Sequence, residues 1–184
     1  RPPPPPTPPT WPRPSTSVPE GRDQNEFDKQ SVLDRFNHQL QTSGLKTSNT
    51  INPDFSWAGS EIGEIKNYFK LEKFILLFPF CSPHLNIKRW PHYNDLIKLI
   101  LNKFGNEYKV VTAPGPTEIN DAKEINSLAI LNNGKALNIS QLTCLIKESS
   151  FVVSNDTGPA HIAAHVGAKG LTLFGKHTTA YKVS

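Results

Sequence analysis

The sequence contains no methionine, only two cysteines and no long hydrophobic run. Because position 1 is not a methionine, we expect the 184 residues to be a fragment, a processed form or the product of a misassigned reading frame. Cys81 and Cys144 form no CxxC pair, which favours a reduced, intracellular protein with two free thiols. The longest nearly unbroken apolar run, Phe74 to Phe80, is far shorter than a membrane span, and no segment resembles a signal peptide.

A strong charge of one sign is also missing. The formal net charge is +4, and half of it comes from three arginines and one glutamate near the N-terminus. The other acidic and basic residues are mixed along the chain, so the charge predicts no nucleic-acid partner.

Proline is abundant but unevenly distributed, with ten of the 17 prolines in RPPPPPTPPTWPRPSTSVP at the N-terminus. A segment this rich in proline, with little apolar surface to bury, is typical of polyproline II or disorder. We therefore expect residues 1–24 to be a Pro-rich disordered tail outside the fold. We favour a misread frame over a functional polyproline ligand as the origin of this tail.

From residue 25 onward, short apolar runs alternate with apolar stripes at helical spacing. The expected helices span Asn25–Ser43, Pro91–Phe104, 117–126, Ile139–Ser149 and 158–167. The expected strands span 73–80, Tyr108–Thr112, 128–131, 151–155 and 170–175, and the polar stretch 47–63 is expected to be a connector. Strands that alternate with helices imply right-handed crossovers and a parallel sheet. The predicted fold is therefore α/β, a Rossmann-like parallel sheet of about five strands with helices on both faces.

Ligands of open parallel sheets bind beyond the carboxyl ends of the strands. Four predicted loops lie at that edge, namely residues 81–90, 113–118, 155–161 and 175–179. These loops hold most of the unusual residues of the chain, so we expect the functional site there.

The segment NDTGPAH (155–161) is the most informative of these loops. Gly158 and Pro159 open a helix whose first amides have no partner within the helix, and such a helix start attracts anions. Thr157 can add a hydroxyl, and Gly158 lets a phosphate approach the backbone closely. Asp156 would repel a phosphate, so we expect it to cap the helix or to fix the loop. A well-capped helix that follows a strand, with no ligand, fits the same pattern.

Two histidines follow on the same predicted helix. His161 and His165 are four residues apart, the spacing of two metal ligands on one helix face, but no third ligand is evident. We therefore predict no metal site. His161 is placed to contribute to a phosphate site, whereas we expect His165 to be a surface or packing residue.

Basic and acidic residues in the other loops fit the same chemistry. Lys88 and Arg89 follow the first sheet strand and are suited to phosphate binding, although two solvated basic residues are an equal alternative. Glu118 could accept hydrogen bonds from ribose hydroxyls or be an ordinary first-turn glutamate. Cys81 and His84 are unlikely partners for nucleophilic catalysis, because a proline lies between them and no helix start would favour the thiolate.

The segment from Asp156 to Gly175 contains every fixed position of the pattern DTGxxHxAxxxGxxxxxLFG. With the KRWP turn (Lys88 to Pro91) and Glu118 in a Gly/Pro-rich loop, the chain resembles glycosyltransferase family 9, the lipopolysaccharide heptosyltransferases. The resemblance covers about Asp34 to Lys176. Phe80 departs from it, because glycine is common there, and so do Lys176 and His177, where Pro-Thr is usual.

The resemblance implies the second half of a two-domain GT-B glycosyltransferase. Residues 25–72 would then be a helix and connector from the end of the first domain, and 73–184 a nucleotide-sugar-binding domain truncated at its C-terminus. The residues implied in donor binding are Ser82, Lys88, Glu118, Asp156, Thr157, Gly158, Pro159 and His161. Of these, Lys88, Thr157, Gly158 and His161 would face the diphosphate and Glu118 the nucleoside, while Ser82 would supply a hydroxyl.

By the same resemblance, the reaction would transfer a heptose from ADP-heptose to the lipopolysaccharide inner core, with inversion and without a metal or other cofactor. The catalytic base would come from the first domain, so this fragment alone would be inactive. The full-length enzyme would act in the cytoplasm, at the inner face of the bacterial inner membrane. Two alternatives stay open: a non-catalytic nucleotide-binding module with a Pro-rich interaction segment, and a nucleotide-sugar epimerase or hydrolase.

Overall fold

The computed structural model describes residues 29–48 and 55–176. The predicted Pro-rich tail (1–24) and His177 lie outside the described residues. The chain divides into two compact units, Arg1–Ile51 with Ala180–Ser184, and Asn52–Thr179. The predicted domain boundaries, after residue 24 from composition and after residue 72 from the resemblance, stay a prediction.

The described part of the first unit contains the amphipathic helix α2 (Val32–Thr42). The prediction of one helix from Asn25 to Ser43 is wrong at its start, because the backbone of Ser31 is extended and its hydroxyl oxygen accepts a hydrogen bond from the Asp34 amide at 3.1 Å. This N-cap begins a new helix at Val32. The helix ends near Gly44, as expected, where φ is +76°.

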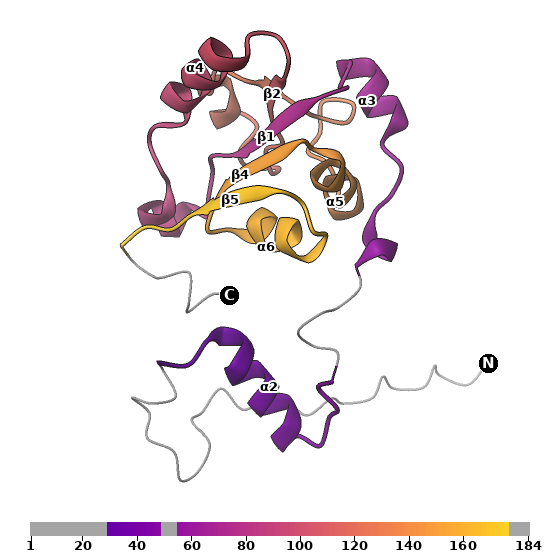
Figure 1. Ribbon diagram of the computed structural model, residues 1–184, viewed down its shortest axis with the longest axis vertical. Helices are drawn as coiled ribbons and strands as arrows, with labels where there is room; N and C mark the ends of the chain where they lie inside the picture. The colour runs from indigo at the N-terminus through magenta and orange to yellow at the C-terminus, as the bar shows by residue number, and fades with distance from the viewer. Residues whose placement is uncertain (1–28, 49–54, 177–184) are drawn as a thin grey trace, which may run out of the picture. The chain divides into compact units, whose positions relative to one another are not determined.

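The second unit contains a five-stranded parallel sheet (Figure 1). Its strands are β1 (Phe74–Phe78), β2 (Lys109–Thr112), β3 (Leu128–Ala129), β4 (Phe151–Asn155) and β5 (Gly170–Leu173). Their order in the sheet is β3-β2-β1-β4-β5, with every neighbouring pair parallel. The predicted Rossmann-like α/β fold is confirmed. The order reverses its direction at β1, so the crevice expected for a ligand lies where β1 and β4 end.

Helices cover both faces of this sheet. The α-helices in the described part of the unit are α3 (Gly63–Phe69), α4 (Tyr93–Phe104), α5 (Ile139–Glu148) and α6 (Gly158–His165). Phe74, Leu76 and Phe78 of β1 pack with α3, α5 and α6 on one face. Ile75 and Leu77 point to the other face and pack with α4. β1 is therefore buried on both faces, which explains its continuous apolar run.

In the second unit, two segments differ from the sequence prediction. Residues 117–126 form turns and the short 3-10 helix η3 (Asp121–Glu124) instead of an α-helix. The side chain of Asn94 on α4 holds the end of this segment. Its Nδ2 atom donates to the Glu124 carbonyl, and its Oδ1 atom accepts from the Asn126 backbone amide. Helix α3 follows the predicted connector and was not predicted. Two further 3-10 helices are η1 (Ser56–Ala58) and η2 (Pro83–Lys88).

No helix within residues 29–48 and 55–176 is both long enough and apolar enough to span a membrane.

Candidate functional site

A pocket of about 450 Å³ lies at the carboxyl ends of the strands. The loops after β1, β2 and β4 line it, and apolar side chains that include Phe80, Leu137 and Leu142 form part of its wall. All eight residues proposed from the sequence line this pocket, namely Ser82, Lys88, Glu118, Asp156, Thr157, Gly158, Pro159 and His161. The eight residues therefore share one pocket, and their assignment to a donor site stays a prediction.

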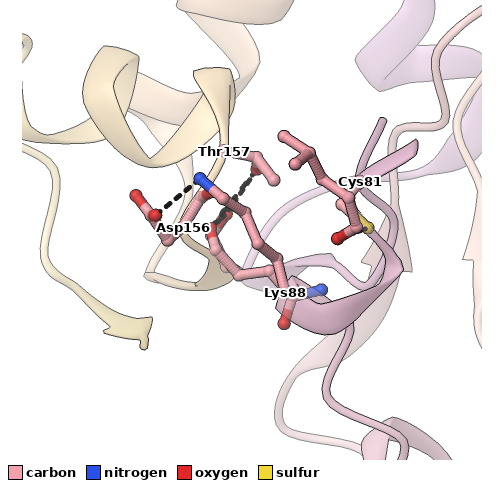
Figure 2. A network of polar contacts seen from close by, with 7 residues as sticks. Cys81, Lys88, Asp156 and Thr157 are labelled. Atoms are coloured by element: carbon pink, nitrogen blue, oxygen red, sulfur yellow. Dashed lines mark hydrogen bonds and ion pairs between the residues drawn. The ribbon is translucent and has the colours of Figure 1, made fainter. Parts of the chain in front are cut away.

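The central polar contact of the pocket is an ion pair between Lys88 and Asp156 (Figure 2). The Lys88 Nζ atom lies 2.7 Å from Oδ2 of Asp156 and 3.2 Å from its backbone carbonyl oxygen. The Asp156 side chain is only 3% exposed, and the lysine side chain is 22% exposed. A carboxylate this buried needs a charged partner, so the pair fixes the lysine amine at the pocket wall.

Asp156 fixes the loop but does not cap the helix. Its amide donates to the Leu173 carbonyl at 3.1 Å, which ties the loop to β5. The N-cap of α6 is Thr157, so of the two roles expected for Asp156 the structure shows the loop-fixing one.

The N-terminus of α6 opens onto the pocket. Thr157 occupies the N-cap position with an extended backbone, but its side chain accepts no hydrogen bond from the helix amides. Its hydroxyl instead donates to the Asn155 carbonyl at 3.3 Å. Gly158 and Pro159 form the first turn, and a Cβ atom added to Gly158 would meet no heavy atom within 4 Å. His161 lines the pocket one turn further along. The helix start therefore offers its dipole and open space to an anion.

Glu118 is positioned by its own loop. Its Oε2 atom accepts a hydrogen bond from the Gly115 amide at 2.8 Å. A side chain at Gly115 would press on this carboxylate, because an added Cβ would lie 3.2 Å from Oε2. The loop thus fixes one carboxylate oxygen of Glu118 at the pocket wall.

The loop after β1 contributes Ser82 and Cys81. The Ser82 carbonyl accepts from the Leu85 amide at 2.8 Å and starts η2. The Cys81 thiol donates to the Leu85 carbonyl at 3.3 Å, and burial raises its pKa, an effect that Arg89 partly offsets. A thiol with a raised pKa is a poor nucleophile, which agrees with the rejection of a Cys–His pair.

Arg89 and His165 serve other contacts. The Arg89 guanidinium lies 5.2 Å from the centre of the Phe80 ring and 3.8 Å from Asp121, and Arg89 does not line the pocket. The His165 ring packs against Phe55 in a tilted arrangement, with ring centres 5.0 Å apart, as expected of a packing residue. Within the described ranges, no three His, Cys, Asp or Glu side chains gather closely enough to hold a metal ion.

Sequence reasoning missed Asn155, the last residue of β4. Its side chain is fully buried directly behind the pocket, with hydrogen bonds to Pro79, Trp90 and Tyr93. An amide at the end of a buried strand that begins with three apolar residues, one residue before Asp156, is a signal that could have identified it.

Comparison with known proteins decides the family. The model of glycosyltransferase family 9 (heptosyltransferase) matches residues 22–182. The chain belongs to glycosyltransferase family 9. A search of curated proteins found no match.

Several solved structures share the fold of this family 9 chain. Escherichia coli ADP-heptose lps heptosyltransferase II is 23% identical, with 68% of this chain and 42% of that chain covered and a TM-score of 0.54. E. coli heptosyltransferase WaaC with ADP is 19% identical, with coverages of 82% and 47% and a TM-score of 0.56. The family 9 glycosyl transferase from Veillonella parvula DSM 2008 is 18% identical, with coverages of 85% and 47% and a TM-score of 0.66. The chain thus spans less than half the length of these proteins.

Proposed function

We propose that this chain is the donor-binding half of a heptosyltransferase that transfers a heptose from ADP-heptose to the lipopolysaccharide inner core. One observation carries the proposal: the eight residues that the family resemblance implies in donor binding line a single pocket at the strand ends. The relative WaaC was solved with ADP, which supports a nucleotide ligand for this pocket. Membership of family 9 favours a transferase over a non-catalytic module, an epimerase or a hydrolase.

The diphosphate of the donor would bind between Lys88 and the N-terminus of α6. A lysine ammonium has three N–H donors, and two of them point to Asp156. The third donor is left for a phosphate oxygen while the ion pair stays intact. The amide of Gly158 and the helix dipole would add to this stabilisation, and the space beside Gly158 would admit the phosphate.

The nucleoside would lie toward Glu118. The Oε2 atom of this residue is held by the Gly115 amide, which leaves Oε1 free to accept hydrogen bonds from ribose hydroxyls. Leu137 and Leu142 offer apolar surface in the same pocket for the rest of the nucleoside.

The reaction would proceed by direct displacement. A hydroxyl oxygen of the acceptor sugar attacks the anomeric carbon of the heptose from the face opposite the phosphate, so the configuration inverts. The bond from that carbon to the phosphate oxygen breaks, and ADP leaves with the electron pair. A carboxylate on the other half of the enzyme takes the hydroxyl proton. Lys88 and the α6 amides would stabilise the charge that develops on the leaving phosphate, without a metal ion.

The acceptor and the cellular location follow from the same proposal. An enzyme that uses a cytoplasmic nucleotide sugar and a lipid-linked core sugar would act in the cytoplasm at the inner face of the bacterial inner membrane. This half of the enzyme would contact the donor only.

Calorimetric titration of the chain with ADP tests the donor site, and the key variant is Gly158→Val. The new side chain would take up space in the pocket that Gly158 leaves open, since nothing lies within 4 Å of an added Cβ. We expect this variant to fold and to bind ADP about tenfold more weakly or not at all, a loss of about 1.4 kcal/mol or more.

Gly63→Val is the matched control, because Gly63 also opens a helix and has the same open space around an added Cβ. It should bind ADP as the unmodified chain does. Lys88→Ala is a less specific test than Gly158→Val, because it also removes the ion-pair partner of the buried Asp156 carboxylate. A folded chain that binds no ADP, or equal ADP affinity of the two valine variants, would contradict the donor-site proposal.

A further inference from the structure

We propose that Asn155 is a positioning residue of the pocket, which holds the loop that carries Lys88 in place against the start of α6. The inference rests on the proposed function, because it concerns the lysine that would meet the donor diphosphate. It assigns a role to a residue that lies behind the pocket and does not line it.

The Asn155 side chain joins both ends of the β1–α4 loop. Its Nδ2 atom donates to the Pro79 carbonyl at 3.0 Å, at the start of the loop. Its Oδ1 atom accepts from the Trp90 amide at 3.3 Å, at the end of the loop. Because the side chain is 0% exposed, no water competes for these bonds. One amide group thus fixes where the loop leaves the sheet and where it returns.

Tyr93 completes the same buried network. Its hydroxyl lies 3.2 Å from Oδ1 of Asn155 and 3.1 Å from the Phe78 carbonyl. The ring is buried under the sheet, and burial raises the pKa of the hydroxyl, so Tyr93 stays a neutral donor. The network therefore connects the end of β1, the end of β4 and the first turn of α4.

The position of Lys88 depends on this network. Lys88 precedes Trp90 by two residues, and its partner Asp156 directly follows Asn155 along the chain. Lys88 and Asp156 lie 68 residues apart in the chain. Asn155 is next to Asp156, and its side chain bonds both ends of the loop that contains Lys88. Loss of the amide would let the loop shift relative to β4, and with it the Lys88 amine relative to the α6 amides.

If Asn155 had a purely structural role, it would only provide hydrogen-bond partners for buried backbone groups. The structural role and the positioning role predict different results. A structural residue affects stability alone, whereas a positioning residue affects ligand binding through Lys88 and loses that effect when Lys88 is absent.

The test compares ADP affinity and melting temperature in the full chain and its Asn155→Ala, Tyr93→Phe and Lys88→Ala variants, at a temperature where each is folded. We expect Asn155→Ala to weaken ADP binding about tenfold and Tyr93→Phe, which removes one hydroxyl, about threefold. In the Lys88→Ala background, neither substitution should weaken ADP binding further.

Thr143→Ala is the matched control. Thr143 is buried on α5, its hydroxyl donates to the Ile139 carbonyl at 2.8 Å, and it does not line the pocket. This variant should lower the melting temperature and leave ADP affinity unchanged.

A second readout needs no ADP. Acetylation of Lys88 by a soluble active ester, followed by mass spectrometry, should become several-fold faster in Asn155→Ala and stay unchanged in Thr143→Ala. The inference is overturned if Asn155→Ala binds ADP like the unmodified chain, if its effect persists undiminished in the Lys88→Ala background, or if Lys88 acetylation does not change. Failure of the unmodified chain to bind ADP would instead overturn the proposed function.

Discussion

Cys144 of α5 is a free thiol whose reactivity depends on its burial and on Glu148 beside it. Its thiol donates to Oε1 of Glu148 at 3.2 Å, and the other oxygen of that carboxylate pairs with the Lys66 ammonium. Burial, together with the hydrogen bond to Glu148 and its negative charge, raises the pKa of the Cys144 thiol to about 11. Since the thiolate is the reactive form, Cys144 should react slowly at neutral pH although it is a free thiol.

We predict that Glu148→Gln accelerates the alkylation of Cys144 by iodoacetamide. The substitution removes the negative charge that opposes the thiolate, so the pKa of Cys144 should fall and the thiolate fraction at pH 8 should rise several-fold. In the unmodified chain, the rate should keep increasing with pH toward about 11. Peptide mass spectrometry gives the rates of both cysteines in one sample.

Cys81 serves as the internal control for this experiment. Burial raises its pKa as well, but its charged neighbours are Arg89, Glu118 and Lys88 rather than Glu148. Its alkylation rate should not respond to Glu148→Gln. An unchanged rate at Cys144 would show that Glu148 does not control that thiol.

At the scale of elements, β5 depends on the close approach of Gly170 to β4. Gly170 pairs with Val152, and a Cβ atom added to it would lie 2.7 Å from the Val152 carbonyl oxygen. Because a real Cβ cannot come so close to a backbone oxygen, the strand would have to move. This strand pairing also positions the carbonyl of Leu173, which accepts from the Asp156 amide.

We predict that Gly170→Ala destabilises the chain by about 1–3 kcal/mol, the usual cost of forcing an extra carbon into a packed site. Urea denaturation followed by circular dichroism measures the change. Gly63→Ala is the control, since nothing lies within 4 Å of its added Cβ and alanine favours the helix, so stability should hold or rise slightly. Equal stability of the two alanine variants would contradict the proposed close contact.

Elements that are stabilised locally or rich in apolar residues could be predicted from the sequence. β1 is an unbroken apolar run, β4 begins with the apolar residues Phe151 to Val153, and α5 begins with a capping box in which Asn138 and Gln141 bond each other's backbone amides. The seven residues of α3 carry only a weak pattern, and their place is set by the packing of Ile62 and Ile65 on the sheet. Tertiary contacts of this kind are not visible in a local sequence window.

The segment 117–126 shows the opposite error. Its spacing of Ile119, Ala122 and Ile125 suggests a helix, yet only Ala122 is buried and the hydrogen bonds of Asn94 hold its end in a different conformation. Asn94 lies on another element, so the local pattern could not reveal this competition.

The candidate site also has a part that the sequence predicts and a part that it does not. Four fixed positions of the DTG motif, Asp156, Thr157, Gly158 and His161, line the pocket, because this part of the motif follows the end of β4. The ion pair of Lys88 with Asp156 and the network around Asn155 join residues more than sixty positions apart. Such pairings follow from the strand order β1-β4, which the sequence pattern leaves open.

At the scale of the whole molecule, the chain should bind the donor nucleotide without the other half of the enzyme. All eight proposed donor contacts lie within the second unit, so the proposal predicts binding without a further domain. Transfer is different, because the proposed base belongs to the other half. Binding is therefore the property to measure on this chain, and it can also decide the question of a metal ion.

We predict that ADP affinity is the same, within about twofold, in excess EDTA and in millimolar Mg²⁺. Magnesium in nucleotide sites is held by one or two carboxylates together with the phosphates. Two carboxylates line this pocket: Asp156 pairs with Lys88, and Glu118 accepts from the Gly115 amide through Oε2 and would use Oε1 for the ribose. Lys88 and the α6 dipole would supply the positive charge instead. Calorimetry in the two buffers measures the effect, and affinity more than about tenfold higher with Mg²⁺, some 1.4 kcal/mol, would exclude a metal-independent donor site.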